Sequence, residues 1–431
     1  MALRNLLTFS LALPTFSIAA TLYATHYDGN VYRLSLEGEG DEVSLKQTQA
    51  LQTCGKARSW LTVDLEPGLL WCSDEPSSGS LTSLEIGNDG ALKEMVKVAA
   101  PNGGVNSIIY PGENGKNYLS IAHYGDTSIS TWEIPFGDKQ EVWPYGVLNF
   151  TLDNPGKAPQ DQSHPHQALL DPTGSFLISP DLGADLVRVF LIDKGSGKLH
   201  ACDSIAYKEG SGPRFGEFMD SAKDTREGNT TLYTVEELGD RLCSFEVSYV
   251  EGSCPKFKEL SCFVPYPGYK LPMNTATLSS IQANNHSLHI SVRKDGELDG
   301  KDSLVTLKLA SDGTVIQEQS LFPSGGIMPR TLAINKKGDY VAVANQETSN
   351  VVGLVPQPGQ WMGLSSILCF TIMRRSPSAI VLLPDDPYTS FIRNLWTVNI
   401  QVFTAAVWLL FELIFSRDDR QQFFESGEVV L

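Results

Sequence analysis

The chain has 431 residues, of which 42% are hydrophobic, so it can bury a large core as one domain or as two or three smaller ones. Charged residues make up only 19%, whereas 37 Gly and 24 Pro indicate many turns, a mixture typical of β-rich proteins. The formal net charge of −17 argues against nucleic acid as a partner, because such binding rests largely on Lys and Arg contacts to phosphate.

Residues 1–19 have the layout of a secretory signal peptide. An early cation at Arg4 precedes an apolar stretch, and the small residues Ser17 and Ala19 predict cleavage near Ala19. A buried first strand or helix is the alternative. Three glycosylation sequons agree with export to the cell exterior or surface. They begin at Asn149, Asn229 and Asn285.

A strand–turn–strand unit recurs along residues 20–390. Its second strands read LYATHY, LLWCSD, YLSIAH, FLISPD, LYTVEE, LHISVR and YVAVAN, and successive copies are 47 to 58 residues apart. A four-stranded unit repeated seven times predicts an all-β, seven-bladed β-propeller, in which stacked blades supply the core. Two β-sandwich domains are the alternative, but the regular period and the absence of an interdomain linker argue against them.

Polar residues end the second strands. Residues equidistant from the turn of an antiparallel hairpin lie opposite each other, which pairs His166 with Asp181 around DPTG and Arg330 with Asn345 around NKKG. Arg214 belongs with Glu237 across a longer turn. All are expected at one mouth of the central channel. Aligned by strand start, the seven residues at this position are Tyr27, Asp74, His123, Asp181, Glu237, Arg293 and Asn345.

The side chains expected at the mouth suit an anionic ligand. Arginine grips carboxylates and phosphates through parallel N–H bonds, and a Glu or His nearby can move protons. A purely structural role in blade-to-blade hydrogen bonding is the alternative. The His164-Pro165-His166 pair supplies too few ligands for zinc, and no phosphate-cradling loop is found, so we expect neither metal nor cofactor. The candidates are the cations Arg214, Arg293 and Arg330, the proton carriers His123, His164, His166 and Glu237, and the hydrogen-bonding Asp181 and Asn345.

The seven cysteines match no zinc-binding spacing, and disulfides are usual in a secreted chain. Cys243 and Cys262 lie symmetrically about the turn VEGSCP, so they are predicted to pair across a hairpin. A Cys54–Cys72 bridge is favoured over any bridge to Cys369.

Several segments resemble the lactonase family of seven-bladed propellers, which includes a type of 6-phosphogluconolactonase and the 3-carboxy-cis,cis-muconate lactonizing enzyme. They are HPHQALLDPTGSFLISPDLGADLVRVFLID, GSGPRFGEF, LYTVEELGDRLCSFEV and MPRTLAINKKGDYVAVANQETSNVV, and the resemblance runs from about Thr21 to about Leu354. It implies a lactone hydrolase or a cycloisomerase acting on a small carboxylate- or phosphate-bearing lactone. The catalytic set that it implies is His166, Arg214, Glu237 and Arg293, with Arg330 close by.

Two departures from the family favour another function, a secreted binding propeller without catalysis. Phe215 and Met219 stand where family members often carry histidine. Secretion also fits poorly with a cytosolic sugar phosphate as substrate.

The last 75 or so residues match nothing in that family, and residues 391–431 form an atypical hydrophobic tail. Because the chain begins with a second-type strand, we expect PSAIVLLPDD (residues 377–386) to close the first blade. The segment 395–415 is long enough to span a bilayer but carries Asn399, Gln401 and Glu412. A membrane anchor, a packed helix and sequence foreign to the native protein all remain open for it.

Overall fold

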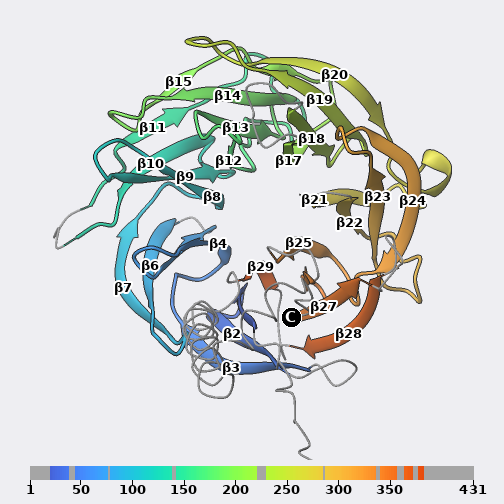
Figure 1. The fold of residues 1–431 in the computed structure, drawn as a ribbon, viewed down its shortest axis with the longest axis horizontal. Coiled ribbons are helices and arrows are strands. Elements are labelled where there is room, and N and C mark those ends of the chain that lie inside the picture. Colours follow the sequence, from blue (N-terminus) through green and yellow to red (C-terminus); the bar gives the residue numbers. More distant parts are fainter. Residues whose placement is uncertain are drawn as a thin grey trace, which may run out of the picture. The chain divides into compact units, whose positions relative to one another are not determined.

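The computed structural model describes residues 20–37, 44–75, 78–137, 142–220, 230–284, 287–335, 340–356, 364–371 and 377–382. These residues form seven antiparallel sheets arranged as the blades of a β-propeller (Figure 1). All of them belong to the first of the two units into which the chain divides, residues 1–383. The predicted fold class is therefore confirmed.

Each blade runs from an inner strand near the centre of the ring to an outer strand at its edge. Blade 1 contains β29 (Pro377–Leu382), β1 (Ala20–His26), β2 (Asn30–Glu37) and β3 (Ser44–Gln52). Blade 2 contains β4 (Arg58–Asp64), β5 (Leu69–Asp74), β6 (Ser80–Ile86) and β7 (Leu92–Ala99). Blade 3 contains β8 (Gly104–Pro111), β9 (Asn117–His123), β10 (Ser128–Ile134) and β11 (Gly146–Asn149). Blade 4 contains β12 (Leu169–Leu170), β13 (Phe176–Asp181), β14 (Leu186–Ile192) and β15 (Leu199–Ala201), and β16 (Ile205–Ala206) also pairs with β14.

The remaining blades follow the same order. Blade 5 contains β17 (Pro213–Asp220), β18 (Thr230–Glu236), β19 (Leu242–Ser248) and β20 (Lys256–Phe263). A short 3-10 helix, η2 (Pro267–Tyr269), connects it to blade 6. Blade 6 contains β21 (Thr277–Ala283), β22 (Ser287–Arg293), β23 (Ser303–Leu309) and β24 (Val315–Pro323). Blade 7 contains β25 (Pro329–Ile334), β26 (Val341–Asn345), β27 (Asn350–Pro356) and β28 (Leu364–Thr371).

The first blade is completed by a strand from the far end of the sequence. β29 pairs antiparallel with β1, with Leu382 opposite Leu22 and Ile380 opposite Ala24. β29 also lies beside the inner strands β25 and β4 of the two adjacent blades. The segment PSAIVL thus closes the ring, as its sequence pattern predicted.

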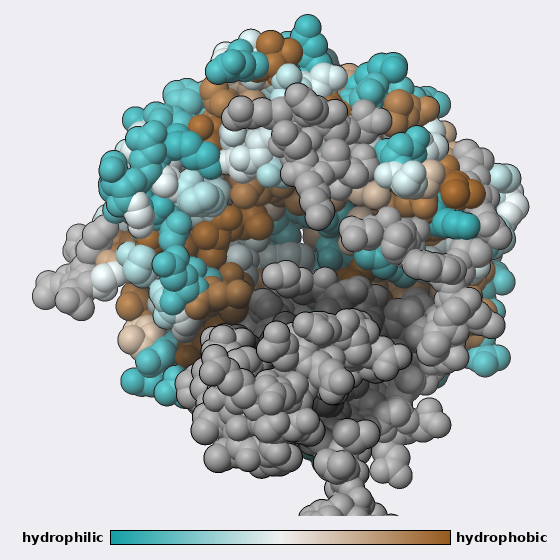
Figure 2. Space-filling model, viewed as in Figure 1, coloured by the Kyte–Doolittle hydropathy of each residue, from teal (hydrophilic) through white to brown (hydrophobic). Residues whose placement is uncertain are grey.

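The core consists of seven hydrophobic clusters, and each fills the interface between two consecutive blades among the described residues. This follows from strand geometry, because successive side chains point to opposite faces of a blade and each face meets a neighbour. Trp71 of blade 2 and Trp132 of blade 3, for example, are both fully buried in the same cluster. On the face shown in Figure 2, hydrophilic residues dominate the outer edge and hydrophobic residues are more common nearer the centre.

Several predicted features of processing and membrane attachment lie outside the described residues: the signal peptide, the sequons at Asn229 and Asn285, and the segment 395–415. Within the described part of the chain, no helix has the length and apolar character needed to cross a bilayer. Asn149 is exposed at the end of β11, where it is accessible to a glycan.

The disulfides agree only in part with the sequence prediction. Cys243 and Cys262 face each other on β19 and β20 and are bonded, with their Cα atoms 4.1 Å apart. The predicted Cys54–Cys72 bridge is wrong: both thiols are free and buried, packed in the cluster between blades 1 and 2.

Cys202 and Cys254 form a second bridge that the sequence analysis missed. Cys202 follows β15 of blade 4, and Cys254 lies in the turn between β19 and β20 of blade 5. Their separation of 52 residues gives no local signal, because only blade packing brings them together.

We expect non-reducing peptide mapping to recover Cys243–Cys262 and Cys202–Cys254, with alkylation of the denatured protein labelling Cys54 and Cys72. Replacing both Cys243 and Cys262 with Ser should lower the free energy of unfolding by about 3 kcal/mol, because the bridge closes a short loop in the unfolded chain. Urea denaturation measures this change. A Cys54–Cys72 peptide, or free thiols at Cys243 and Cys262, would contradict the assignment.

Candidate active site at the mouth of the propeller

We call the mouth the end of the ring at which the second strand of each blade finishes. Near this end, the first strand of each blade carries one extra residue. In blade 5, Pro213 pairs with Glu236 and Phe215 pairs with Val235, so Arg214 has no residue opposite it. Such a β-bulge bends the strand and redirects a side chain. The same shift by one residue occurs in the inner strand pair of all seven blades.

The bulges correct two predicted neighbour pairs. Pro165 lies opposite Asp181 in place of His166, and Pro329 lies opposite Asn345 in place of Arg330. The predicted pairing, counted outward from the turn, is displaced by one residue because a bulge places two residues of one strand opposite one residue of the other. Arg330, like Arg214, is itself the bulged residue.

The second strands also end one residue earlier than predicted in two blades. β1 ends at His26 and β18 at Glu236, so Tyr27 and Glu237 are the residues that follow the strand ends. The corresponding residues in blades 2 and 3 are Glu75 and Tyr124.

Glu237 joins two arginines from neighbouring blades. Its Oε2 lies 2.5 Å from Arg214 Nε, and its Oε1 lies 3.5 Å from Arg293 Nη1. Arg214 also donates from Nη1 to the carbonyl oxygen of Ser279, at 2.7 Å. Both arginines are buried, whereas the Glu237 side chain is 22% exposed. The structure therefore brings three of the four predicted catalytic residues into direct contact.

A second ion pair lies in the same neighbourhood. Arg330 Nη2 is 3.3 Å from Glu75 Oε2, which also accepts a hydrogen bond of 2.8 Å from the hydroxyl of Tyr27. The Arg330 guanidinium lies 5.9 Å from the centre of the Tyr27 ring. Burial raises the pKa of Tyr27 to about 12, so its hydroxyl remains a donor. Sequence reasoning missed Glu75, although aligning it with Glu237 as a residue following a strand end would have found it.

His166 contributes a neutral imidazole. It is buried, and burial together with the charges of Arg214, Arg330 and Arg293 lowers its pKa well below the usual range. Its ring centre lies 5.6 Å from that of Phe215 and 5.7 Å from that of Tyr124. At neutral pH, His166 therefore carries no charge.

Aromatic side chains form a wall around these groups. Trp60 lies 5.9 Å from Phe215, and His164 stacks on Tyr124 at 3.8 Å with its Nδ1 2.7 Å from the Tyr124 carbonyl oxygen. Phe215 is thus part of this wall, and it also belongs to the hydrophobic cluster between blades 5 and 6.

The other departure from the family lies in the core. Met219 belongs to the hydrophobic cluster between blades 5 and 6, where its sulfur accepts a hydrogen bond from Tyr233 at 3.8 Å. This substitution does not alter the mouth.

Asp181 has a structural role in place of the predicted substrate contact. It is fully buried, and its carboxylate accepts hydrogen bonds from Ser163 Oγ at 2.5 Å, His164 N at 2.7 Å and Arg188 Nε at 2.7 Å. It therefore anchors the segment that leads to His166.

Asn345 and His123 also make structural contacts. Both are fully buried: Asn345 Nδ2 donates to the carbonyl oxygen of Ser324 at 2.9 Å, and His123 Nε2 lies 2.7 Å from Ser130 Oγ. Burial also lowers the pKa of His123 to about 4. These contacts hold loops and strands in place.

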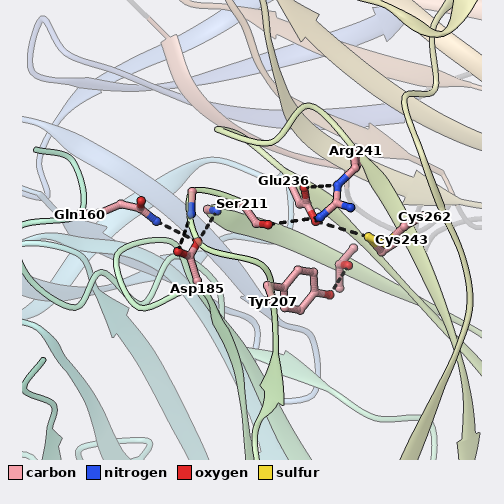
Figure 3. A network of polar contacts seen from close by, with 11 residues as sticks. Gln160, Asp185, Tyr207, Ser211, Glu236, Arg241, Cys243 and Cys262 are labelled. Atoms are coloured by element: carbon pink, nitrogen blue, oxygen red, sulfur yellow. Dashed lines mark hydrogen bonds and ion pairs between the residues drawn. A yellow bond between two sulfur atoms is a disulfide. The ribbon is translucent and has the colours of Figure 1, made fainter. Parts of the chain in front are cut away.

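A polar network holds the loop that precedes Arg214 (Figure 3). The Asp185 carboxylate accepts hydrogen bonds from the backbone of Gly210 at 2.8 Å and of Gly212 at 2.7 Å. Arg241 binds both oxygens of Glu236 at 2.8 Å and donates to Ser211 Oγ at 3.2 Å. Since Glu237 follows Glu236 directly, this network positions both partners of the Arg214–Glu237 ion pair.

Glu236 also lies beside the Cys243–Cys262 sulfurs, an arrangement with the spacing of a metal site. The two sulfurs are bonded to each other, so they cannot act as thiolate ligands.

Buried polar atoms without a partner at the mouth indicate a ligand. Within the described part of the chain, Arg293 Nε and Nη2 and His166 Nδ1 are buried without a hydrogen-bond partner. Leaving a buried donor unpaired is costly, about 1–3 kcal/mol. A bound oxygen-rich molecule would satisfy these atoms.

A seven-bladed propeller with a mouth rich in arginine is the class that these features define. The family described as "Lactonase, 7-bladed beta-propeller" matches residues 19–357, and the chain belongs to it.

Individual relatives agree with this family. A "Probable 6-phosphogluconolactonase" of Arthroderma benhamiae is 29% identical over 308 residues, covering 70% of this chain and 75% of that protein. The structure of the Pseudomonas aeruginosa periplasmic gluconolactonase PpgL has a TM-score of 0.68 and 21% identity, covering 85% of this chain and 99% of that one. A putative 6-phosphogluconolactonase of Bacteroides fragilis also has a TM-score of 0.68, with 19% identity and coverage of 85% and 98%. The two solved structures share the fold.

Glu217, three residues after Arg214 on β17, predicts how the free energy of unfolding depends on pH. Gln282 donates to its Oε2 at 3.0 Å, and burial raises its pKa from 4.5 to about 8. A raised carboxyl pKa favours folding at low pH, and this contribution is lost as pH rises from about 4.5 through about 8. Glu217→Gln should therefore flatten the fall in unfolding free energy between pH 5 and pH 9.

Urea denaturation at pH 5, 7 and 9 measures this difference. The control is Glu246→Gln, which removes a partly exposed carboxylate paired with Lys258 on outer strands. A Glu217→Gln protein with the same pH slope as the unmodified one would show that Glu217 is ionised throughout.

Proposed function

We propose that the protein hydrolyses a small anionic lactone, as the names of its 6-phosphogluconolactonase relatives suggest. The observation that carries this proposal is the buried Arg214–Glu237–Arg293 group beside neutral His166, with open donors on Arg293. Two guanidinium groups can bind an anionic substituent and the charge that develops on a carbonyl oxygen.

Hydrolysis requires water to attack the lactone carbonyl, forming a tetrahedral oxyanion, after which the bond to the ring oxygen breaks. The Glu237 carboxylate is the more exposed member of its ion pairs, and it accepts the proton of the attacking water. Arg293 stabilises the oxyanion through its open N–H groups. The protonated Glu237 then gives this proton to the departing ring oxygen, which restores its carboxylate, and neutral His166 hydrogen-bonds to the substrate.

A cycloisomerase that opens or closes a carboxylate-bearing lactone could use the same groups, with Glu237 moving a proton at carbon. The products separate the two reactions, because hydrolysis incorporates an oxygen atom from water and isomerisation does not. A propeller that binds such a ligand without catalysis is the other alternative, and it predicts no turnover.

We also propose that the protein is exported from the cell. It is supported by the signal-like residues 1–19, by the exposed Asn149 sequon and by the two disulfides.

Glu237→Gln should lower kcat for lactone hydrolysis by about 100-fold or more and change KM little, because the lost charge acts in the transition state. Arg293→Ala should lower kcat and raise KM, since it binds both substrate and oxyanion. Acid release in a pH-stat, corrected for spontaneous opening, measures both. Glu246→Gln is the matched control outside the site, and full activity in Glu237→Gln would place the chemistry elsewhere.

A further inference from the structure

The mouth contains more negative charge than a phosphate site would need. The three guanidinium groups of Arg214, Arg293 and Arg330 are matched by two carboxylates, Glu237 and Glu75. Three positive charges minus two negative charges leave a single positive charge, and His166 is neutral. One negative charge on the substrate would bring the net charge of these groups to zero. A second negative charge would have no positive partner.

Glu75 is the residue that sets this balance. It occupies Arg330 at 3.3 Å and also accepts the hydrogen bond of Tyr27. The open donors at the mouth are on Arg293, in the other ion-pair group. Arg330 therefore has its charge already countered, and Arg293 is left to meet one anionic group.

A phosphate monoester carries a charge between about −1.5 and −2 at pH 7. Its excess charge would lie beside side chains that are mostly buried, since Arg330 is 13% and Glu75 is 32% exposed. Solvent screens the repulsion between charges poorly there. The aromatic wall of Trp60, Phe215 and Tyr124 adds no countercharge, but it can pack against the apolar face of a sugar ring.

We propose that Glu75 determines specificity by limiting the substrate to one negative charge, so that the protein acts on sugar lactones bearing one carboxylate in preference to phosphorylated lactones. This inference rests on the proposed lactone hydrolysis. Glu75 acts through Arg330 and Tyr27 and is a positioning residue.

The test uses three lactones on one six-carbon frame that differ in charge. The 1,4-lactones of gluconic, glucaric and 6-phosphogluconic acid carry no charge, one carboxylate and one phosphate. We expect the native protein to have its highest kcat/KM with the glucaric lactone. Glu75→Gln should shift the ratio of kcat/KM for the phosphorylated over the carboxylate lactone by about tenfold or more, because it frees the charge of Arg330.

Two control variants separate this effect from loss of fold or of bulk charge. Glu75→Asp keeps the charge and should keep the native preference. Glu347→Gln removes an exposed charge from the loop after β26 and should change the ratio by less than about twofold. Thermal melting verifies that each variant is folded.

Binding of gluconate and of 6-phosphogluconate, measured by calorimetry, keeps the test independent of catalysis. If no lactone is opened, the proposed function fails, yet a gluconate preference that Glu75→Gln shifts about tenfold toward 6-phosphogluconate still supports the role of Glu75. A native preference for the phosphorylated ligand, or a ratio that Glu75→Gln leaves unchanged, overturns the inference.

Discussion

The bulge near the start of the inner strands β17 and β25 controls where Arg214 and Arg330 can point. Without the extra residue, side chains along β17 and β25 would alternate strictly between the two faces of a blade, where neighbouring blades are packed with apolar residues. Bonds between adjacent inner strands hold this geometry. Gln167 exchanges two hydrogen bonds with the backbone of Gly216, and Ser279 Oγ donates to the carbonyl oxygen of Arg330. The scaffold of the site is therefore the contact between blades.

Burial makes the charges of the mouth depend on one another. A buried guanidinium requires a carboxylate or backbone oxygen, and Arg214 has both in Glu237 and Ser279. The same enclosure keeps His166 uncharged among cations. Because the carboxylates already hold the arginines, a ligand must compete with them or use the donors that remain open. Affinity and charge selectivity thus arise from the same ion pairs.

Sequence reasoning recovered what depends on periodicity and on symmetry about a turn. Strand spacing predicted the seven blades, and the hairpin geometry predicted Cys243–Cys262. The strand ends also predicted that Arg214, Arg293 and Glu237 gather at one mouth, and the structure shows the two arginines in contact with Glu237. A bulge leaves no clear trace in one sequence, so the partners of Asp181 and Asn345 were displaced by one residue. Glu75 and the Cys202–Cys254 bridge depend on how blades meet, which local patterns do not encode.

The closure of blade 1 by β29 also constrains how the chain is made. During synthesis β1 emerges early, while the strand that covers its inner edge emerges after the other six blades. Until then, the backbone of β1 offers unpaired N–H and carbonyl groups to any other strand, including one from a second nascent chain. A strand from another chain that occupied this edge would exclude β29 and leave the ring open.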